Sequence, residues 1–270
     1  MPVAELTFDR STVTGWLAAA SREAGALALQ KFRSPLKSWT KGGHSPVTEV
    51  DIAVDELLRE RLTAAAPTYA WLSEESVDDP ARLDARQVWV VDPIDGTRAF
   101  LAGREDWVIA AALVEDGRPL SAAIYAPVED QLFLATAGQG TTVNGVRALS
   151  SADAGWQRAR VAGPKRYIDA LRRVQGEIEA LPKIHSLALR LARVASGTLD
   201  VAFAAGNSHD WDLAAADLIV REAGGALTTF QDQQLTYNCP TPVHTPLIAA
   251  GRARHEHLIR LIRQQRTAFA

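Results

Sequence analysis

The stretch "VWVVDPIDGTRAF", residues 88–100, decides the fold because it joins an apolar run to a group of acids. Residues 88–91 are β-branched or aromatic without alternation, which predicts a strand buried on both faces. Pro93 has no N–H for a sheet ladder and restricts the residue before it to extended conformations. We therefore expect Asp92 to end the strand and residues 93–96 to form a turn.

The residues after this strand combine two carboxylates with a backbone suited to anions. Asp92 and Asp95 lie three residues apart. Gly96 can adopt a positive φ and lets a ligand approach the backbone, and Thr97 opens a short helix whose first N–H groups favour an anion. An isolated pattern of this kind is usually an ordinary Asp/Gly turn. The rest of the sequence has to decide between the two interpretations.

Length and composition indicate an ordinary globular protein. The chain has 270 residues, enough for one large or two small domains, with 47% hydrophobic and 23% charged residues. The net charge is -3, from 29 basic and 32 acidic side chains, and no basic run suggests a nucleic-acid partner. The arginine-rich segment 251–266 predicts an amphipathic terminal helix with its apolar residues inward.

The single cysteine, Cys239, excludes a disulfide within the chain and fits a reducing cytoplasm. No apolar window approaches 18 residues, and the first residues lack the pattern of a signal peptide. We therefore expect a cytoplasmic protein with neither a membrane nor a nucleic acid as partner.

The order of expected elements predicts an α+β protein with an α+β half at 1–150 and an α/β half at 151–270, and with the boundary near residues 149–157. An antiparallel meander is expected over residues 107–143, because Asp-Gly and Asn-Gly turns separate its apolar runs. The first half is otherwise expected to contain a helix at 11–32 capped by Ser11, a loop at 37–50, a helix at 51–66 that ends before Pro67, and a short strand within 69–76. In the second half we expect strands at 159–163, 199–204, 225–230 and 246–251, and helices near 167–180, 186–196, 212–223 and 252–265.

Two further segments carry acids that the fold does not require. Glu74 and Glu75 follow the short strand in "WLSEES". Asp210 and Asp212 open the helix of "HDWDLAAADLIVREAGG". Taken singly, such acids are solvated loop residues or helix caps.

Taken together, these segments form a known pattern. The ordered set "PVTEVD" (46–51), "EE" (74–75), "DPIDGT" (92–97) and "WD" (211–212) resembles the signature of the inositol monophosphatase superfamily. These are magnesium-dependent, lithium-sensitive phosphatases, and the resemblance covers roughly residues 41–225. It implies a layered αβαβα sandwich whose first half carries most of the metal ligands and whose second half carries the last aspartate and the substrate loops.

The resemblance also implies a role for individual residues. Gly96 and Thr97 are expected to bind phosphate through backbone N–H groups. Thr97 and Asp51 are expected to position the attacking water, and Glu75 to lie next to the metals. Glu74 is expected to serve both in catalysis and as a metal ligand. The expected metal ligands are the carboxylates of Glu74, Asp92, Asp95 and Asp212 and the carbonyl of Ile94.

Elementary chemistry agrees with a metal site. Ligands that are all oxygen suit Mg²⁺. At ~4 Å and an effective dielectric of ~20, each pair of carboxylates repels by about 4 kcal/mol, so such a cluster needs cations. Two or three Mg²⁺ ions would neutralise it and clamp a phosphate for in-line attack by a metal-activated water. An aspartyl nucleophile of the haloacid dehalogenase type fits less well, because in "DPIDGT" the second acid comes one residue later than in that family's D-x-D.

The substrate is less defined by the sequence. "DGTRAFLAG" and "IYAPVEDQLF" look closest to bacterial 3'(2'),5'-bisphosphate nucleotidases, whereas Ala204 and Ala205 stand where inositol monophosphatases carry a glutamate. We expect a bisphosphate nucleotide or an inositol monophosphate, with histidinol-phosphate and sugar bisphosphates as alternatives. Lys165 and Asp210 are candidate substrate contacts. An interaction protein with residual phosphatase activity and a homodimeric assembly remain open.

Overall fold

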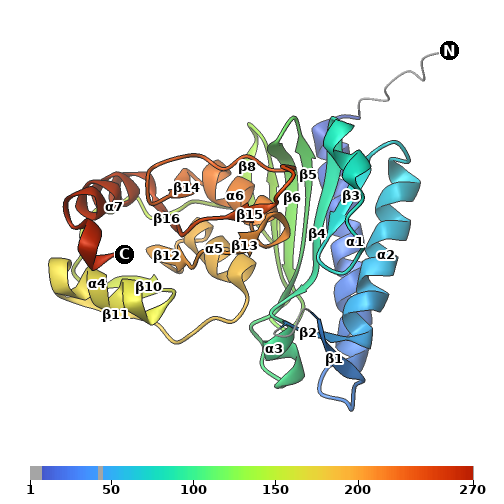
Figure 1. Ribbon diagram of the computed structural model, residues 1–270, viewed down its shortest axis with the longest axis horizontal. Coiled ribbons are helices and arrows are strands. Elements are labelled where there is room, and N and C mark those ends of the chain that lie inside the picture. The colour runs from blue at the N-terminus through green and yellow to red at the C-terminus, as the bar shows by residue number, and fades with distance from the viewer. Residues whose placement is uncertain (1–7, 42–44, 270) are drawn as a thin grey trace.

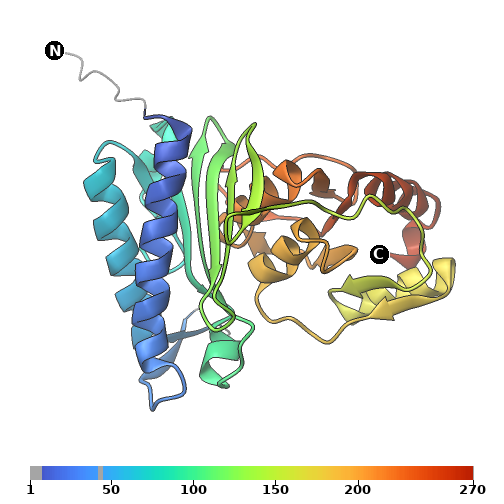
Figure 2. The same cartoon turned by 180° about the vertical axis from the view of Figure 1, so that it is seen from behind.

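The computed structural model describes residues 8–41 and 45–269. Helices and sheets alternate in five layers, in the order αβαβα, and the same order is seen from behind (Figures 1 and 2). The predicted α+β class and the layered sandwich are confirmed. Among the described residues, no helix has both the length and the apolar character needed to cross a membrane.

The larger sheet has seven strands in chain order. Its first two strands are parallel and all other neighbours are antiparallel, which confirms the predicted meander. The turns at Asp116-Gly117 and Asn144-Gly145 adopt positive φ, as two-residue hairpins require. The strands are β3 (Ala70–Ser73), β4 (Gln87–Asp95), β5 (Val108–Glu115), β6 (Arg118–Ala126), β7 (Gln131–Thr136), β8 (Gly140–Val143) and β9 (Val146–Ala148).

Strand β4 is buried along its whole length because both of its faces meet a core. Val88 and Val90 belong to the core between the two sheets. Trp89 and Val91 belong to the core beneath the first layer of helices. Alternate side chains of a strand point to opposite faces, so the predicted two-sided burial is confirmed and explains why the run does not alternate.

The end of β4 differs from the prediction. The strand does not stop at Asp92 but continues to Asp95. Asp92 pairs with Ala110 and Asp95 with Val108, so β4 holds one residue more than its partner, as in a β-bulge. Pro93 is accommodated within the bulge, where no ladder hydrogen bond is needed.

The first layer consists of α1 (Arg10–Lys31) and α2 (Glu49–Ala65). Helix α1 begins one residue earlier than predicted. Its N-cap is Asp9, whose carboxylate accepts from the N–H groups of Ser11 at 3.2 Å and Thr12 at 3.3 Å. The prediction of Ser11 as cap was wrong, because a charged carboxylate satisfies two of the free N–H groups at once.

The segment 37–50, predicted to be a loop, contains a small hairpin. Strand β1 (Ser38–Lys41) pairs antiparallel with β2 (Ser45–Thr48). Residues 42–44 of the predicted loop lie outside the described residues. Thr48 ends β2 and also caps α2, so the hairpin is joined directly to the first layer of helices.

The smaller sheet has the order β11-β10-β12-β16-β14. The predicted helix near residues 167–180 ends at Gln175, because Gly176 adopts a positive φ and stops it. Residues 178–180 instead form an edge strand parallel to β10. The strands are β10 (Ala159–Ala162), β11 (Ile178–Ala180), β12 (Val201–Ala204), β14 (Gly225–Thr229) and β16 (Leu247–Gly251).

Two inner helices separate the sheets, and two outer helices cover the far face of the smaller sheet (Figure 1). Because the inner helices pack against both sheets, one core spans the residues on either side of the boundary near 150, and the division into two domains stays a prediction. The inner helices are α5 (Leu187–Ala195) and α6 (Asp210–Glu222), and the outer helices are α4 (Lys165–Gln175) and α7 (Arg252–Gln264). The remaining short elements are η1 (Pro80–Asp84), α3 (Thr97–Leu101), β13 (Ser208–His209), β15 (Val243–His244) and η2 (Arg266–Ala268).

Candidate metal centre

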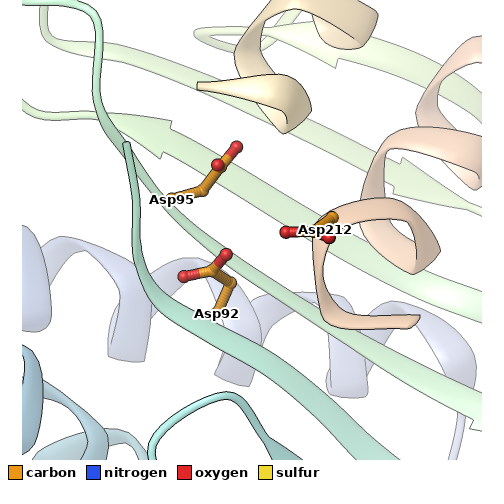
Figure 3. Close-up of side chains that lie close together, drawn as sticks. All are labelled: Asp92, Asp95 and Asp212. Atoms are coloured by element: carbon orange, nitrogen blue, oxygen red, sulfur yellow. The ribbon is translucent and has the colours of Figure 1, made fainter. Parts of the chain in front are cut away.

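Three carboxylates from distant parts of the chain meet beside the end of β4. Asp92 and Asp95 project from this strand, and Asp212, in the first turn of α6, points toward them (Figure 3). One ligand atom from each of the three lies within 4.8 Å of the others. They line a cavity of ≈ 380 Å³ together with Glu74 and Ile94. The structure thus brings together the five residues predicted as metal ligands.

Hydrogen bonds hold two of the three carboxylates, and the third has none. The Oδ2 atom of Asp95 accepts from the Ser186 hydroxyl at 2.6 Å and from the Ala188 N–H at 2.5 Å, at the start of α5. The Oδ2 atom of Asp212 accepts from the His209 N–H at 2.6 Å. Asp92 is 1% exposed, and neither of its oxygens has a hydrogen-bond partner among the described residues.

Burial and mutual repulsion raise the pKa of these acids. Burial, followed by the charges of Glu74 and Asp95, raises the pKa of Asp92 well above its usual range. Burial and the charge of Asp212 raise the pKa of Glu74 to about 8. Burial and the charge of Asp95 raise the pKa of Asp212 to about 7. At ~4.8 Å and an effective dielectric of ~20, each ionised pair repels by about 3 kcal/mol. The cluster is therefore unfavourable when ionised unless cations bind to it.

The donor set fits Mg²⁺. A buried carboxylate without a hydrogen-bond donor is costly unless it is protonated or bound to a cation, and Asp92 is such a group. The expected ligands, four carboxylates and one carbonyl, offer only oxygen atoms. A hard divalent cation such as Mg²⁺ prefers oxygen ligands. Asp92, Asp95 and Asp212 would form the centre of the site, with Glu74 at its side.

The acids that follow β3 are held by the hairpin that the sequence did not predict. The Glu74 N–H donates to the Val91 carbonyl at 3.3 Å, which fixes the backbone beside β4. Lys41, from β1, donates to the Glu74 carbonyl and lies 3.4 Å from the Glu75 carboxylate. Glu75 is thus next to the cluster and does not line the cavity, and its expected place beside the metals stays a prediction.

Thr97 and Asp51 form a hydrogen-bonded pair at the cavity. The Thr97 hydroxyl lies 3.0 Å from Asp51 Oδ1 and 3.1 Å from the Ile94 carbonyl. The other oxygen of Asp51 accepts from the Thr48 N–H at 2.8 Å. Thr97 lines the cavity, whereas Asp51 is 1% exposed and lies behind it. Any effect of Asp51 on a water in the cavity therefore passes through the Thr97 hydroxyl.

Gly96 occupies a position that other residues tolerate poorly. Its φ is +103°, and a Cβ atom there would lie 3.0 Å from the Asp106 carbonyl. The close approach keeps the chain between β4 and α3 against the segment that follows α3. Gly96 lines the cavity beside Thr97, and their binding of phosphate through N–H groups stays a prediction.

Two predicted substrate contacts do not reach the cavity. Lys165 begins α4 in the outer layer, is exposed, and pairs with Asp169 one turn later at 2.5 Å. The helix predicted from about residue 167 starts two residues earlier, directly after Pro164, and this start places Lys165 on α4. Asp210 is fully buried, and its carboxylate lies 2.7 Å from His244 Nε2 and accepts from the Asn238 N–H at 2.7 Å. It ties the start of α6 to the segment around β15.

Residues 181–186 contribute to the site and were not predicted to do so. Lys183 and His185 line the cavity, and Ser186 donates to Asp95. The His185 ring lies 2.7 Å from Asp106 Oδ2. Ser186 is also the N-cap of α5. The sequence predicts a helix near residues 186–196, but nothing local shows that the Ser186 hydroxyl would meet β4.

Comparisons with known proteins agree with this geometry. The sequence profile described as "Inositol monophosphatase family" matches residues 9–267. An inositol-1-monophosphatase of Rhizobium meliloti is 35% identical over 194 residues, which are 68% of this chain and 72% of that protein. Nus factor SuhB of Escherichia coli is 32% identical over 222 residues, 78% of this chain and 82% of that protein. The crystal structure of extragenic suppressor protein suhB from Bartonella henselae superposes with a TM-score of 0.84 at 28% identity, over 94% of this chain and 99% of that one.

Proposed function

Because the chain belongs to the inositol monophosphatase family, we propose that it is a magnesium-dependent phosphatase that hydrolyses a small, soluble phosphate monoester. The observation that carries the proposal is the carboxylate of Asp92, which is buried without a hydrogen-bond donor beside Asp95 and Asp212. Two or three Mg²⁺ ions at this cluster would supply the charge that holds a phosphate and activates a water for in-line attack.

The residues of the chain would divide the remaining work. Gly96 and Thr97, at the start of α3, would hold the oxygens of the phosphate. With its proton donated to Asp51, the Thr97 hydroxyl would be able to accept a hydrogen bond from a water in the cavity. Burial raises the pKa of Asp51, which makes its carboxylate a better acceptor for the proton that Thr97 relays.

The residues around the cavity support a proposal for the substrate class. We propose a 3'(2'),5'-bisphosphate nucleotide as the preferred ester and an inositol monophosphate as the second choice. Ala204 lies buried in β12 and Ala205 follows it. Because alanine has no carboxylate, neither residue can hold ring hydroxyls as an acid would. Arg98 and Lys183 line the same cavity, and their charges favour anionic substrates.

The test is phosphate release from a panel of phosphate monoesters as a function of Mg²⁺ concentration. Asp95→Asn should abolish turnover, because it removes a charge from the metal cluster. Asp169→Asn, an acid on α4 outside the cavity, is the matched control and should leave turnover unchanged. Mg²⁺-independent release, or an Asp95→Asn variant as fast as wild type at millimolar Mg²⁺, would contradict the proposal.

A macromolecular binding role is the second candidate, and the name Nus factor carried by the Escherichia coli relative favours it. Binding of a partner does not require the metal cluster, so Asp95→Asn would retain such a role while losing turnover. Rescue of a gene-deletion phenotype by Asp95→Asn as fully as by wild type would support binding. Failure of this folded variant to rescue would assign the cellular role to the phosphatase.

A further inference from the structure

A second cavity adjoins the metal site. It has a volume of ≈ 510 Å³ and shares Lys183 with the first cavity. The boundary is formed by His185, which lines the first cavity, and by Asp106, which lines the second and is hydrogen-bonded to it. A substrate whose phosphate reaches the metal cluster therefore has room to extend past Lys183.

The charges of the second cavity leave one cation available. Each of its three arginines has a carboxylate partner. The pairs are Arg33–Glu105 at 3.2 Å, Arg104–Asp106 at 3.1 Å and Arg193–Glu129 at 2.6 Å. Among the described residues no ion pair or hydrogen bond involves the ammonium of Lys183, which is exposed. An anion can bind to this ammonium without breaking an existing pair.

The backbone around Lys183 is held in place by several contacts. Leu181 donates to the Val161 carbonyl at 2.9 Å. His185 donates through its N–H to Asp106 Oδ2 at 2.6 Å, and the Ile184 carbonyl accepts from Arg190 at 3.2 Å. Only the side chain of Lys183 would have to be ordered on binding, which limits the entropic cost.

We propose that Lys183 binds a second anionic group of the substrate, a phosphate or carboxylate on the part that is not cleaved. The inference rests on the proposed function, because the metal cluster fixes where the cleaved phosphate lies. Lys183 is thereby a specificity-determining residue that favours bisphosphates over monophosphates.

The experiment compares matched pairs of esters that differ only in the second phosphate. The pairs are 3'-phosphoadenosine 5'-phosphate with adenosine 3'-phosphate, fructose 1,6-bisphosphate with fructose 1-phosphate, and inositol 1,4-bisphosphate with inositol 1-phosphate. For at least one pair, wild type should prefer the bisphosphate by about tenfold in kcat/KM, the effect of one charge-assisted contact at a solvent-exposed rim. Lys183→Ala should reduce this ratio to about one, and Lys183→Arg should restore most of it.

Two controls separate the proposal from a general effect of charge or folding. Lys165→Ala removes an exposed lysine outside both cavities and should leave the ratio unchanged. Lys183→Ala should lower kcat/KM for the bisphosphate about tenfold more than it lowers kcat/KM for the monophosphate. A tenfold loss for both members of a pair would mean that Lys183 contacts the cleaved phosphate, and would overturn the proposal.

Other outcomes also decide the question. No preference for any bisphosphate in wild type, or a preference that Lys183→Ala retains, would refute the inference while leaving the phosphatase intact. If wild type releases no phosphate from any ester, the proposed function fails. The proposed role of Lys183 is then tested by calorimetric binding of the same pairs of esters in Mg²⁺. Equal dissociation constants of the bisphosphate for wild type and Lys183→Ala would refute that role.

Discussion

The acids of the candidate metal centre should make the metal-free protein less stable as the pH rises. Glu74 has a pKa of about 8 in the folded protein, from burial and the charge of Asp212, against an ordinary value of 4.5. Between pH 4.5 and about pH 8, Glu74 is protonated in the folded state and ionised in the unfolded state. The free energy of unfolding therefore falls by about 1.4 kcal/mol per pH unit. This contribution is complete below about pH 4.5 and is lost as the pH rises to about 8.

The magnitude is large enough to measure. Over the two units from pH 5 to pH 7, Glu74 alone accounts for a loss of about 3 kcal/mol. For a chain of this size that corresponds to a fall in Tm of about 6–12 °C. Burial lowers the pKa of His209 and His255, so their contribution rises with pH and opposes the fall. A comparison of variants removes these histidines from the result, because they are present in every protein compared.

The assay is urea or thermal unfolding of wild type and Glu74→Gln from pH 5 to pH 8 with a chelator present. The stability of wild type should fall relative to Glu74→Gln, because the amide does not titrate. Glu56→Gln, on the exposed side of α2, is the matched control and should follow wild type. Saturating Mg²⁺ should abolish the difference in slope, because it binds the ionised cluster of the folded state. Parallel profiles for wild type and Glu74→Gln without divalent cations would refute the reasoning.

Three further outcomes are expected. Thr97→Ala should lower kcat about 10²-fold with little change in KM, and Thr97→Ser should restore it, whereas a change in KM alone would make Thr97 a binding residue only. Gly96→Ala should destabilise the protein by about 1–3 kcal/mol in urea unfolding, and by more than Gly138→Ala, which shares the positive φ but meets no atom within 4 Å. Equal losses would show that the approach to Asp106 is unimportant. Li⁺ resembles Mg²⁺ in size with half its charge, so tens of millimolar Li⁺ should inhibit phosphate release, and full activity there would count against lithium sensitivity.

Much of the centre could be predicted because its determinants are local in the sequence. The apolar run before Asp92 identifies a buried strand, and the acids on either side of Pro93 mark where it meets the site. The continuation of β4 to Asp95 was missed, since Pro93 argues for a turn unless the partner strand accommodates a bulge. Whether a bulge forms depends on the register with β5, which local sequence does not determine.

The residue proposed to contact the substrate, Lys183, could not be predicted for a different reason. Lys165 and Lys183 both follow short apolar segments in the second half, and their sequence neighbourhoods do not distinguish them. Helix α4 places the first in the outer layer with Asp169 as its partner. Lys183 lies at the cavity because its neighbour His185 is bonded to Asp106, which is far away in the sequence. Only the tertiary arrangement separates the two lysines.

The central claim is that Asp92, Asp95 and Asp212 bind the divalent cations used in phosphate hydrolysis. The most direct measurement is anomalous diffraction from crystals grown with Mn²⁺ in place of Mg²⁺ and with inorganic phosphate. The account predicts anomalous peaks within ligand distance of these three carboxylates, with a phosphate bound beside Gly96 and Thr97. Crystals of active enzyme in which Mn²⁺ is bound elsewhere, with the three carboxylates free of metal, would contradict it.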